Sequence, residues 1–171
     1  MTLAQTLKEK KELSNDLKRR YKLPLKNKAL WLIQVSNKTL LQKLYFGLAN
    51  LPADFVVVWD FWKEWRDDQF KNIYVTKKVN KSTLKAFDFT VVDSDLSNLS
   101  QYSEKAIVTI APEDNHYSSV LKEYNPMKSV WNAYLYEETN EWSIFYAVAR
   151  YLENYKISFD NKSLVKNVYE G

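Results

Sequence analysis

The 171-residue chain contains no cysteine, only one histidine and only two glycines. Without cysteine it can form no disulfides, thiol nucleophile or cysteine metal site, and this composition suits a reducing compartment. No apolar run approaches the roughly 18 residues that a membrane-spanning helix needs. Met1 leads directly into a charged segment rather than the apolar core of a signal peptide. We therefore predict a cytoplasmic protein with no membrane partner and no metal ion.

Glycine is the scarcest of the residues that shape loops. Average usage predicts about twelve glycines in a chain of this length, but only Gly47 and Gly171 are present. Gly47 lies in a helical pattern and Gly171 is the last residue, so no predicted loop contains glycine. A loop that wraps a phosphate usually needs glycine for positive φ and close backbone approach. The sequence therefore excludes a Walker-type loop and disfavours any wrapped pyrophosphate.

Positive charge is concentrated at the N-terminus. Residues 1–30 hold nine Lys or Arg and three Asp or Glu, a net +6, whereas the remaining residues sum to −2. A basic helix can bind nucleic acid or an acidic partner. A solvated, lysine-rich helix face is the alternative, and we favour it because the rest of the sequence offers no basic surface to continue the patch. A nucleic-acid partner is accordingly disfavoured, and binding of an anionic polymer stays a third hypothesis.

Strand-like and helix-like patterns alternate along the chain. Short, nearly continuous apolar runs indicate strands buried on both faces, and apolar residues at spacings of three and four indicate helices. We expect strands over 29–35, 55–59, 72–76, 87–92, 106–111 and 131–136, and helices over 3–21, 38–50, 60–69, 80–86, 96–104, 140–155 and 162–169. The alternation predicts an α/β fold, a single Rossmann-like, doubly wound parallel sheet of five to six strands with helices on both faces. Residues 1–171 form one domain in this prediction, with a basic helix over 1–24 and C-terminal helices over 138–171.

Several local strings, in their order and spacing, resemble one family. They are Leu17-Lys18-Arg19-Arg20-Tyr21-Lys22-Leu23-Pro24, Lys38-Thr39-Leu40-Leu41-Gln42-Lys43-Leu44, Leu51-Pro52-Ala53-Asp54-Phe55-Val56-Val57-Val58, Asn132-Ala133-Tyr134-Leu135-Tyr136-Glu137-Glu138 and the helix Trp142 to Lys156. Together they resemble the C-terminal half of starch and glycogen synthases, retaining glycosyltransferases of the GT-B fold. That resemblance implies a domain descended from one that binds ADP-glucose or UDP-glucose, without the half that binds the growing glucan.

The resemblance also assigns candidate ligand-binding residues. In the family an arginine and a lysine after the first strand neutralise the donor diphosphate; here the loop begins at Ser36, Lys38 matches the lysine, and no arginine is found. The nearest equivalents of an acidic residue that contacts the donor in the family are Asp93 and Asp95, without the family's surrounding proline and glycines. The structural alternatives are a solvated lysine in the first turn of a helix and helix capping after Asp93.

After the fifth predicted strand, the family's double glycine is replaced by acidic residues. The sequence reads Pro112-Glu113-Asp114-Asn115-His116 at this point, which makes Asp114 and His116 the remaining candidates. A carboxylate about 4 Å from a phosphate costs about 4 kcal/mol at an effective dielectric near 20. His116 could act as a general base near neutral pH, but a lone loop histidine is more often a surface residue, and with Asp114 it supplies too few metal ligands.

These departures predict a non-catalytic binding or interaction module derived from a glycosyltransferase domain. The alternative is the nucleotide-sugar-binding half of an enzyme that a separate chain completes. We expect no catalytic residue and no cofactor, and either self-association or a separate protein partner. One further cluster is rich in aromatic side chains: Trp59, Phe61, Trp62, Trp65 and Phe70. Such a cluster suits sugar stacking or an interface, and we favour packing in the core or between subunits.

Overall fold

A computed structural model describes residues 1–27, 29–59, 70–94, 96–114, 117–125, 127–128 and 130–171. Its centre is a six-stranded sheet in which every strand pair is parallel, with the order β3-β2-β1-β4-β5-β6. The strands are β1 (Leu30–Gln34), β2 (Asp54–Val58), β3 (Ile73–Thr76), β4 (Phe89–Val92), β5 (Val108–Pro112) and β6 (Ala133–Tyr136). This is the strand order of a doubly wound, Rossmann-like sheet, as the sequence predicts.

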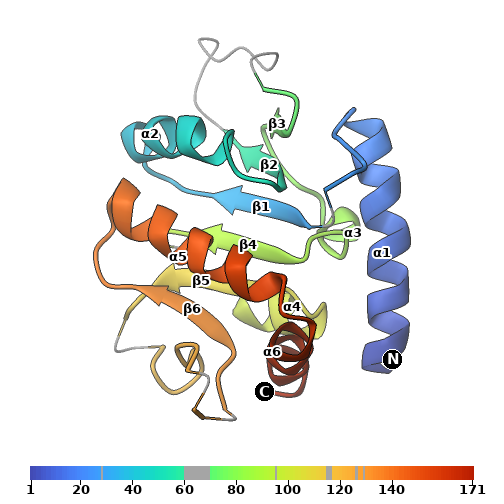
Figure 1. Ribbon diagram of the computed structural model, residues 1–171, viewed down its shortest axis with the longest axis vertical. Coiled ribbons are helices and arrows are strands. Elements are labelled where there is room, and N and C mark those ends of the chain that lie inside the picture. Colours follow the sequence, from blue (N-terminus) through green and yellow to red (C-terminus); the bar gives the residue numbers. More distant parts are fainter. Residues whose placement is uncertain (28, 60–69, 95, 115–116, 126, 129) are drawn as a thin grey trace.

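Helices cover both faces of the sheet and the end at which its strands begin. They are α1 (Leu3–Arg20), α2 (Lys38–Leu48), α3 (Lys81–Leu84), α4 (Leu99–Glu104), α5 (Glu141–Tyr155) and α6 (Ser158–Glu170). Figure 1 shows α2 and α5 in front of the sheet, α4 behind it, and α1 along the edge where the strands begin. The carboxyl ends of the strands therefore point away from α1 and lie together at the opposite end of the sheet.

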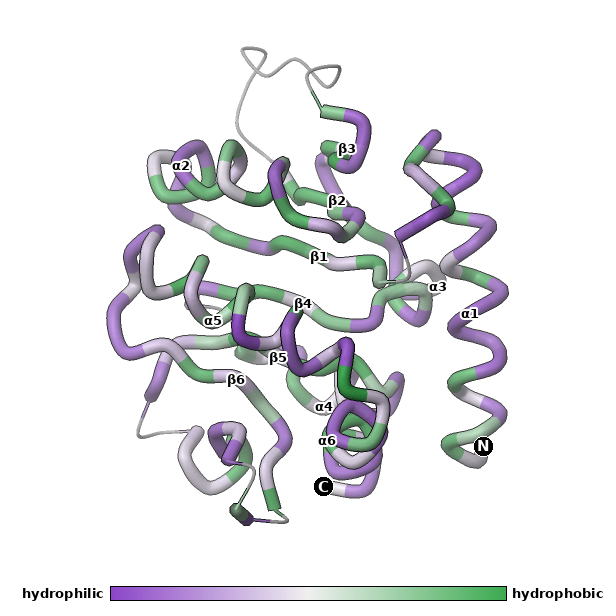
Figure 2. The backbone as a smooth tube through the Cα atoms, viewed as in Figure 1, coloured by the Kyte–Doolittle hydropathy of each residue, from purple (hydrophilic) through white to green (hydrophobic). Residues whose placement is uncertain are grey.

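Each strand contributes side chains to two cores, which is why the strand sequences are apolar throughout. Trp31 and Ile33 of β1 pack with α2, α5 and α6, whereas Leu30 and Leu32 pack with α1, α3 and α4. All four side chains are buried. The tube coloured by hydropathy shows mostly apolar strands at the centre and a mostly hydrophilic α1 beside them (Figure 2).

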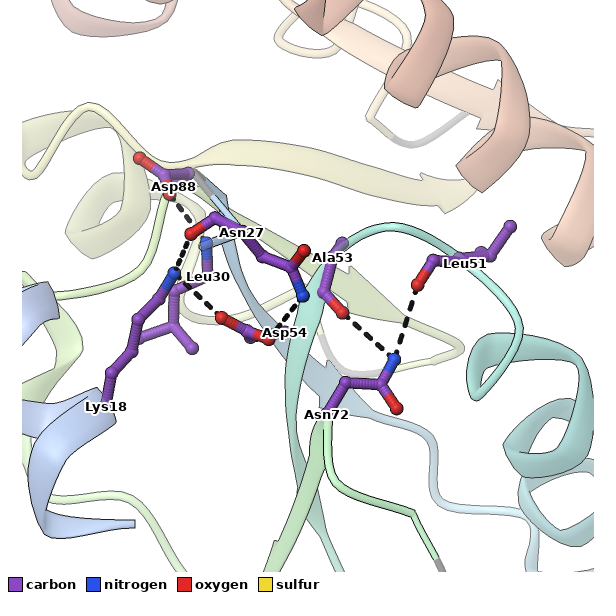
Figure 3. Close-up of polar contacts among 8 residues, drawn as sticks. All are labelled: Lys18, Asn27, Leu30, Leu51, Ala53, Asp54, Asn72 and Asp88. Carbon is purple, nitrogen blue, oxygen red and sulfur yellow. Dashed lines mark hydrogen bonds and ion pairs between the residues drawn. The ribbon is translucent and has the colours of Figure 1, made fainter. Parts of the chain in front are cut away.

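Two buried lysines attach α1 to the amino edge of the sheet. Lys10 Nζ donates to the carbonyl oxygens of Phe87 (2.7 Å) and Ala106 (2.6 Å). Lys18 Nζ lies 2.9 Å from Asp54 Oδ2 in a fully buried ion pair (Figure 3). Burial lowers the pKa of Lys10 to about 8, against the opposing charge of Asp88. Part of the basic N-terminal segment is therefore structural, since both ammonium groups are used inside the protein.

The predicted elements agree with the structure except at the C-terminus and at element ends. The final helix was predicted over 162–169, but α6 begins at Ser158. Its first turn is polar apart from an exposed Phe159, so apolar spacing does not reveal it, whereas Leu164 and Val168 are buried and mark the later turns. The predicted helix over 60–69 and most of the aromatic cluster lie outside the described residues.

Helix ends in this glycine-poor chain use residues other than glycine in the left-handed backbone conformation. Lys22 (φ 56°) and Ala106 (φ 51°) are the non-glycine residues with positive φ in the described part of the chain. Each follows the C-cap of a helix, α1 and α4 respectively. This position is usually glycine, because a Cβ atom is strained there.

Replacing Lys22 with glycine should stabilise the protein. Leu23 N donates to Lys18 O (2.9 Å) and Lys22 N to Arg19 O (3.3 Å), the two bonds of a Schellman motif, so the backbone geometry already suits glycine. Lys22 is exposed, and its side chain buries little. We expect Lys22→Gly to raise the free energy of unfolding by about 0.5–1 kcal/mol in urea titrations. Lys26→Gly, also at an exposed site but with no positive φ, is the control and should not stabilise.

Candidate functional site

The candidate site lies where the connections that follow β1 and β4 leave the sheet in opposite directions. These two strands are neighbours although they are far apart in sequence. In open α/β sheets the crevice beyond the carboxyl ends of such a strand pair is the usual ligand site. Ser36 follows β1 and Asp93 directly follows β4, so both candidates flank this position.

Hydrogen bonds from the segment after β1 to the Asp93 carboxylate span the space between the ends of β1 and β4. Asp93 Oδ2 accepts from Ser36 N (2.8 Å), Ser36 Oγ (2.8 Å) and Asn37 N (3.2 Å). Its other oxygen, Oδ1, accepts from Ser94 Oγ at 3.2 Å. Only 8% of Asp93 is exposed. One carboxylate oxygen thus takes three donors from the segment that leads into α2.

Two backbone N–H groups at the amino end of α2 have acceptors from within the chain, Asn37 N in Asp93 and Leu40 N in Asn37. Asn37 is the N-cap, and its side chain accepts from Leu40 N at 3.0 Å. Free backbone N–H groups and the helix dipole make a helix N-terminus attractive to an anion. Here the anion is the Asp93 side chain, and the amides of Ser36 and Asn37 point to it. An external phosphate would have to displace this carboxylate to reach the same donors.

Tyr136, at the end of β6, covers the neighbouring carboxyl ends of β4 and β5. Its hydroxyl reaches past β5 and donates to Val92 O at 2.6 Å, and only 3% of the residue is exposed. Burial raises the pKa of Tyr136, and the nearby charge of Asp93 raises it further. The tyrosine therefore stays neutral and serves as a hydrogen-bonded cover over the strand ends.

Acidic side chains gather beyond β5. A cavity of about 240 Å³ is lined by Glu113, Asp114 and Glu123, with Lys122 also in its wall. Glu123 Oε1 lies 2.6 Å from Arg150, and Glu123 Oε2 accepts from the backbone N of Leu135. Glu113 and Asp114, the carboxylates that the sequence places at this strand end, therefore line a cavity together with Glu123, which is paired with Arg150.

Of the residues that the sequence marks for the site, the structure brings Ser36 and Asp93 together, and Asp95 lies outside the described residues. Ser36 and Asp93 are in direct contact, Lys38 is the exposed first residue of α2, and Asp114 lies beyond β5. His116 lies outside the described residues. Sequence reasoning missed Asn37 and Tyr136. An asparagine between a strand and a helix is a recognisable cap signal, whereas nothing in the sequence indicates that Tyr136 reaches β4.

Within the described ranges, no group of three or more His, Cys, Asp or Glu side chains is placed to hold a metal ion. No helix among the described residues is long and apolar enough to cross a membrane.

No protein-family model matches the sequence, and no curated protein is significantly similar to it. Solved structures do match. The catalytic domain of starch synthase IV from Arabidopsis thaliana, bound to ADP and acarbose, aligns with a TM-score of 0.73 and 15% identity over 94% of this chain and 38% of that one. The glycosyltransferase of kitacinnamycin aligns with a TM-score of 0.57 and 10% identity, over 88% and 41%.

A third structure, concerning EarP-mediated arginine glycosylation of translation elongation factor EF-P, aligns with a TM-score of 0.54 and 14% identity. It covers 98% of this chain and 63% of that one. The chain therefore spans 38–63% of the length of these three structures. At such low identity the similarity establishes the fold. The resemblance to starch-synthase-type glycosyltransferases inferred from sequence strings is confirmed at that level.

Proposed function

We propose that the chain is a non-catalytic binding or interaction module that descends from the nucleotide-sugar half of a GT-B glycosyltransferase. One observation carries this proposal: Asp93 occupies the anion-binding end of α2, through three hydrogen bonds to one carboxylate oxygen. In this proposal the module binds a partner without transferring a sugar. The donors of Ser36 and Asn37, which would face a diphosphate, are already hydrogen-bonded to Asp93. Its cysteine-free composition fits a cytoplasmic setting.

Electrostatics at the strand ends supports the same proposal. A phosphate placed near the amides of Ser36 and Asn37 would meet the Asp93 carboxylate, and one placed beyond β5 would meet Asp114 and its neighbours. Each carboxylate within about 4 Å of a phosphate costs about 4 kcal/mol near a protein surface. That cost corresponds to roughly a thousandfold weaker binding.

Exposed aromatic side chains support a role in protein association. Trp142 and Tyr146 lie on α5, Phe46 on α2 and Phe159 on α6, and each is at least 56% exposed. Lys43 of α2 pairs with Glu141 of α5 at 2.9 Å, so these two helices lie side by side. Aromatic residues are enriched in protein interfaces. Exposed aromatic side chains of this kind suit contact with a second copy of the chain or a separate protein partner.

The alternative function is the nucleotide-sugar-binding half of a glycosyltransferase that a separate chain completes. The observation that favours it is the match to the starch synthase IV catalytic domain, whose structure contains ADP, over 94% of this chain. In this alternative, Lys38 at the start of α2 would approach the diphosphate after Asp93 turned away.

The two functions differ in their response to nucleotide sugars. We expect no change in the melting temperature of the protein when ADP-glucose or UDP-glucose is added at millimolar concentration, because a ligand that does not bind the native state does not stabilise it. Differential scanning fluorimetry measures this directly. A concentration-dependent rise with either sugar nucleotide would favour the enzyme half over the non-catalytic module.

A further inference from the structure

Two segments of the chain are basic and entirely free of acidic residues. Residues 17–53 contain no Asp or Glu, and neither do residues 69–87. The second segment alone holds five lysines: Lys71, Lys77, Lys78, Lys81 and Lys85. In the sequence the two segments are separated by an acidic stretch, and they do not form a common patch.

The fold brings these two segments together. Tyr21, the C-cap of α1, stacks on Tyr74 of β3 with ring centroids 3.7 Å apart and ring planes at 7°. β3 is an edge strand, paired only with β2 in the sheet order. Figure 1 shows the C-terminal end of α1 beside β3 and the segment leading to α3. The tyrosine pair therefore joins the basic end of α1 to the basic segment after β3.

The cations in the two chain segments that contain these tyrosines face solvent. The exposed ones are Arg20, Lys22, Lys26, Lys77, Lys78 and Lys81. None of these six forms an ion pair with another described residue, whereas Arg19 pairs with Asp16 and Lys85 with Glu9. Tyr21 and Tyr74 are both partly exposed. We refer to these six cations and the two tyrosines as the tyrosine-centred basic surface.

We propose that the tyrosine-centred basic surface binds single-stranded nucleic acid. Proteins that bind single strands without sequence preference combine cations along the phosphate backbone with aromatic rings on which bases stack. The tyrosine-centred basic surface supplies cations and aromatic rings, from α1 and β3, which the Tyr21–Tyr74 stack joins. An acidic peptide would use the cations but not the partly exposed rings. The inference is independent of the crevice at Asp93, which lies at the carboxyl ends of β1 and β4.

The test is fluorescence anisotropy of the full chain with a labelled oligouridine of about 15 nucleotides, at several salt concentrations. If about four phosphates are neutralised, log K should fall against log salt with a slope near −3. Lys77→Glu/Lys78→Glu should weaken binding at least tenfold at low salt, because two attractive contacts become repulsive. Lys122→Glu/Lys128→Glu alters the net charge equally at two exposed sites and should bind like the wild type. Both residues belong to the segment between β5 and β6, which Figure 1 shows away from α1.

A second variant separates stacking from charge. Tyr21→Leu should weaken oligouridine binding about tenfold while leaving the salt slope unchanged, since ring stacking contributes independently of counterion release. Its melting temperature is measured alongside, so that loss of fold is recognised. Three outcomes would overturn the proposal: equal weakening by the two double variants, equally strong competition by polyglutamate of matched charge, or binding to phosphatidylserine vesicles without binding to oligouridine.

Discussion

Lys18→Met should lower the free energy of unfolding by about 3–5 kcal/mol, because it leaves the buried carboxylate of Asp54 without a counter-charge. The Lys18 and Asp54 side chains are only 2% and 0% exposed, and their charged atoms are 2.9 Å apart. Lys18 Nζ also donates to Asn27 O at 2.5 Å, and Asn27 Nδ2 donates to Asp54 Oδ1 at 2.7 Å (Figure 3). Methionine keeps an unbranched apolar side chain, one atom shorter than lysine, but removes the charge and every donor. Urea titration measures the loss.

The chain offers a matched control for this prediction. Lys43 and Glu141 are also 2.9 Å apart, but Lys43 is 55% exposed. An exposed pair of this kind contributes at most about 1 kcal/mol, so Lys43→Met should change stability little. The double variant Lys18→Met/Asp54→Asn should be more stable than Lys18→Met alone, because no unpaired charge remains buried at this position. Similar losses in the two single variants would contradict the role assigned to burial.

Acid should partly relieve the Lys18→Met defect. Burial raises the pKa of Asp54 above its usual 3.8, and the hydrogen bond from Lys18 opposes this shift. Without Lys18 the shift grows, so the folded variant binds a proton at a pH where the unfolded chain does not. A carboxyl group with a raised folded-state pKa loses stability as the pH rises through that interval. The stability gap between Lys18→Met and the wild type should therefore narrow as the pH is lowered toward about 4.

Asp93→Ala is the second change with a large expected effect. It removes the acceptor of three hydrogen bonds and leaves the amides of Ser36 and Asn37 facing an empty site at the end of α2. We expect a loss of about 2 kcal/mol in the free energy of unfolding, typical of hydrogen bonds to a charged group. Millimolar sulfate or phosphate should then restore part of the melting temperature of the variant, because the vacated donors form an anion site.

Ser36→Ala provides the comparison for Asp93→Ala. It removes only the hydroxyl donor, and both amide bonds to Asp93 remain. The expected loss is about 1 kcal/mol, with no anion-dependent recovery. An equal rise of the melting temperature with sulfate in Asp93→Ala, Ser36→Ala and the wild type would mean that the anion acts on the protein surface generally. That result would refute the claim that Asp93 occupies an anion-binding position at the start of α2.

Much of the fold can be predicted from the sequence because each strand is buried on both faces. The run from Leu30 to Ile33 feeds two cores at once, so it is apolar throughout and easily recognised. The start of α6 could not be predicted, since Ser158, Phe159 and Asp160 are exposed or only partly buried and leave no apolar periodicity. The apolar pattern of a sequence therefore reveals a helix or strand only where its side chains are buried in the core.

The site was less accessible to sequence reasoning, because its contacts join residues that are far apart in the chain. The sequence marks Ser36 and Asp93 as separate candidates, yet they are 57 positions apart and only the β1–β4 pairing brings them together. Likewise, Lys10 and Lys18 look like solvated members of a basic helix face, but their ammonium groups are buried among backbone carbonyls. Charge composition indicates how many cations are present, and only the fold determines which remain exposed.

Backbone amide NMR of the isotope-labelled wild-type chain, titrated with ADP-glucose, tests the central claim most directly. The claim is that the Asp93 carboxylate permanently fills the position that a donor diphosphate would need. Accordingly, the amide resonances of Ser36 and Asn37 should stay in place up to millimolar ligand, and they should move in Asp93→Ala when phosphate is added. Saturable shifts of these two resonances in the wild type would mean that a nucleotide sugar displaces the carboxylate, and the chain would then be half of a working transferase.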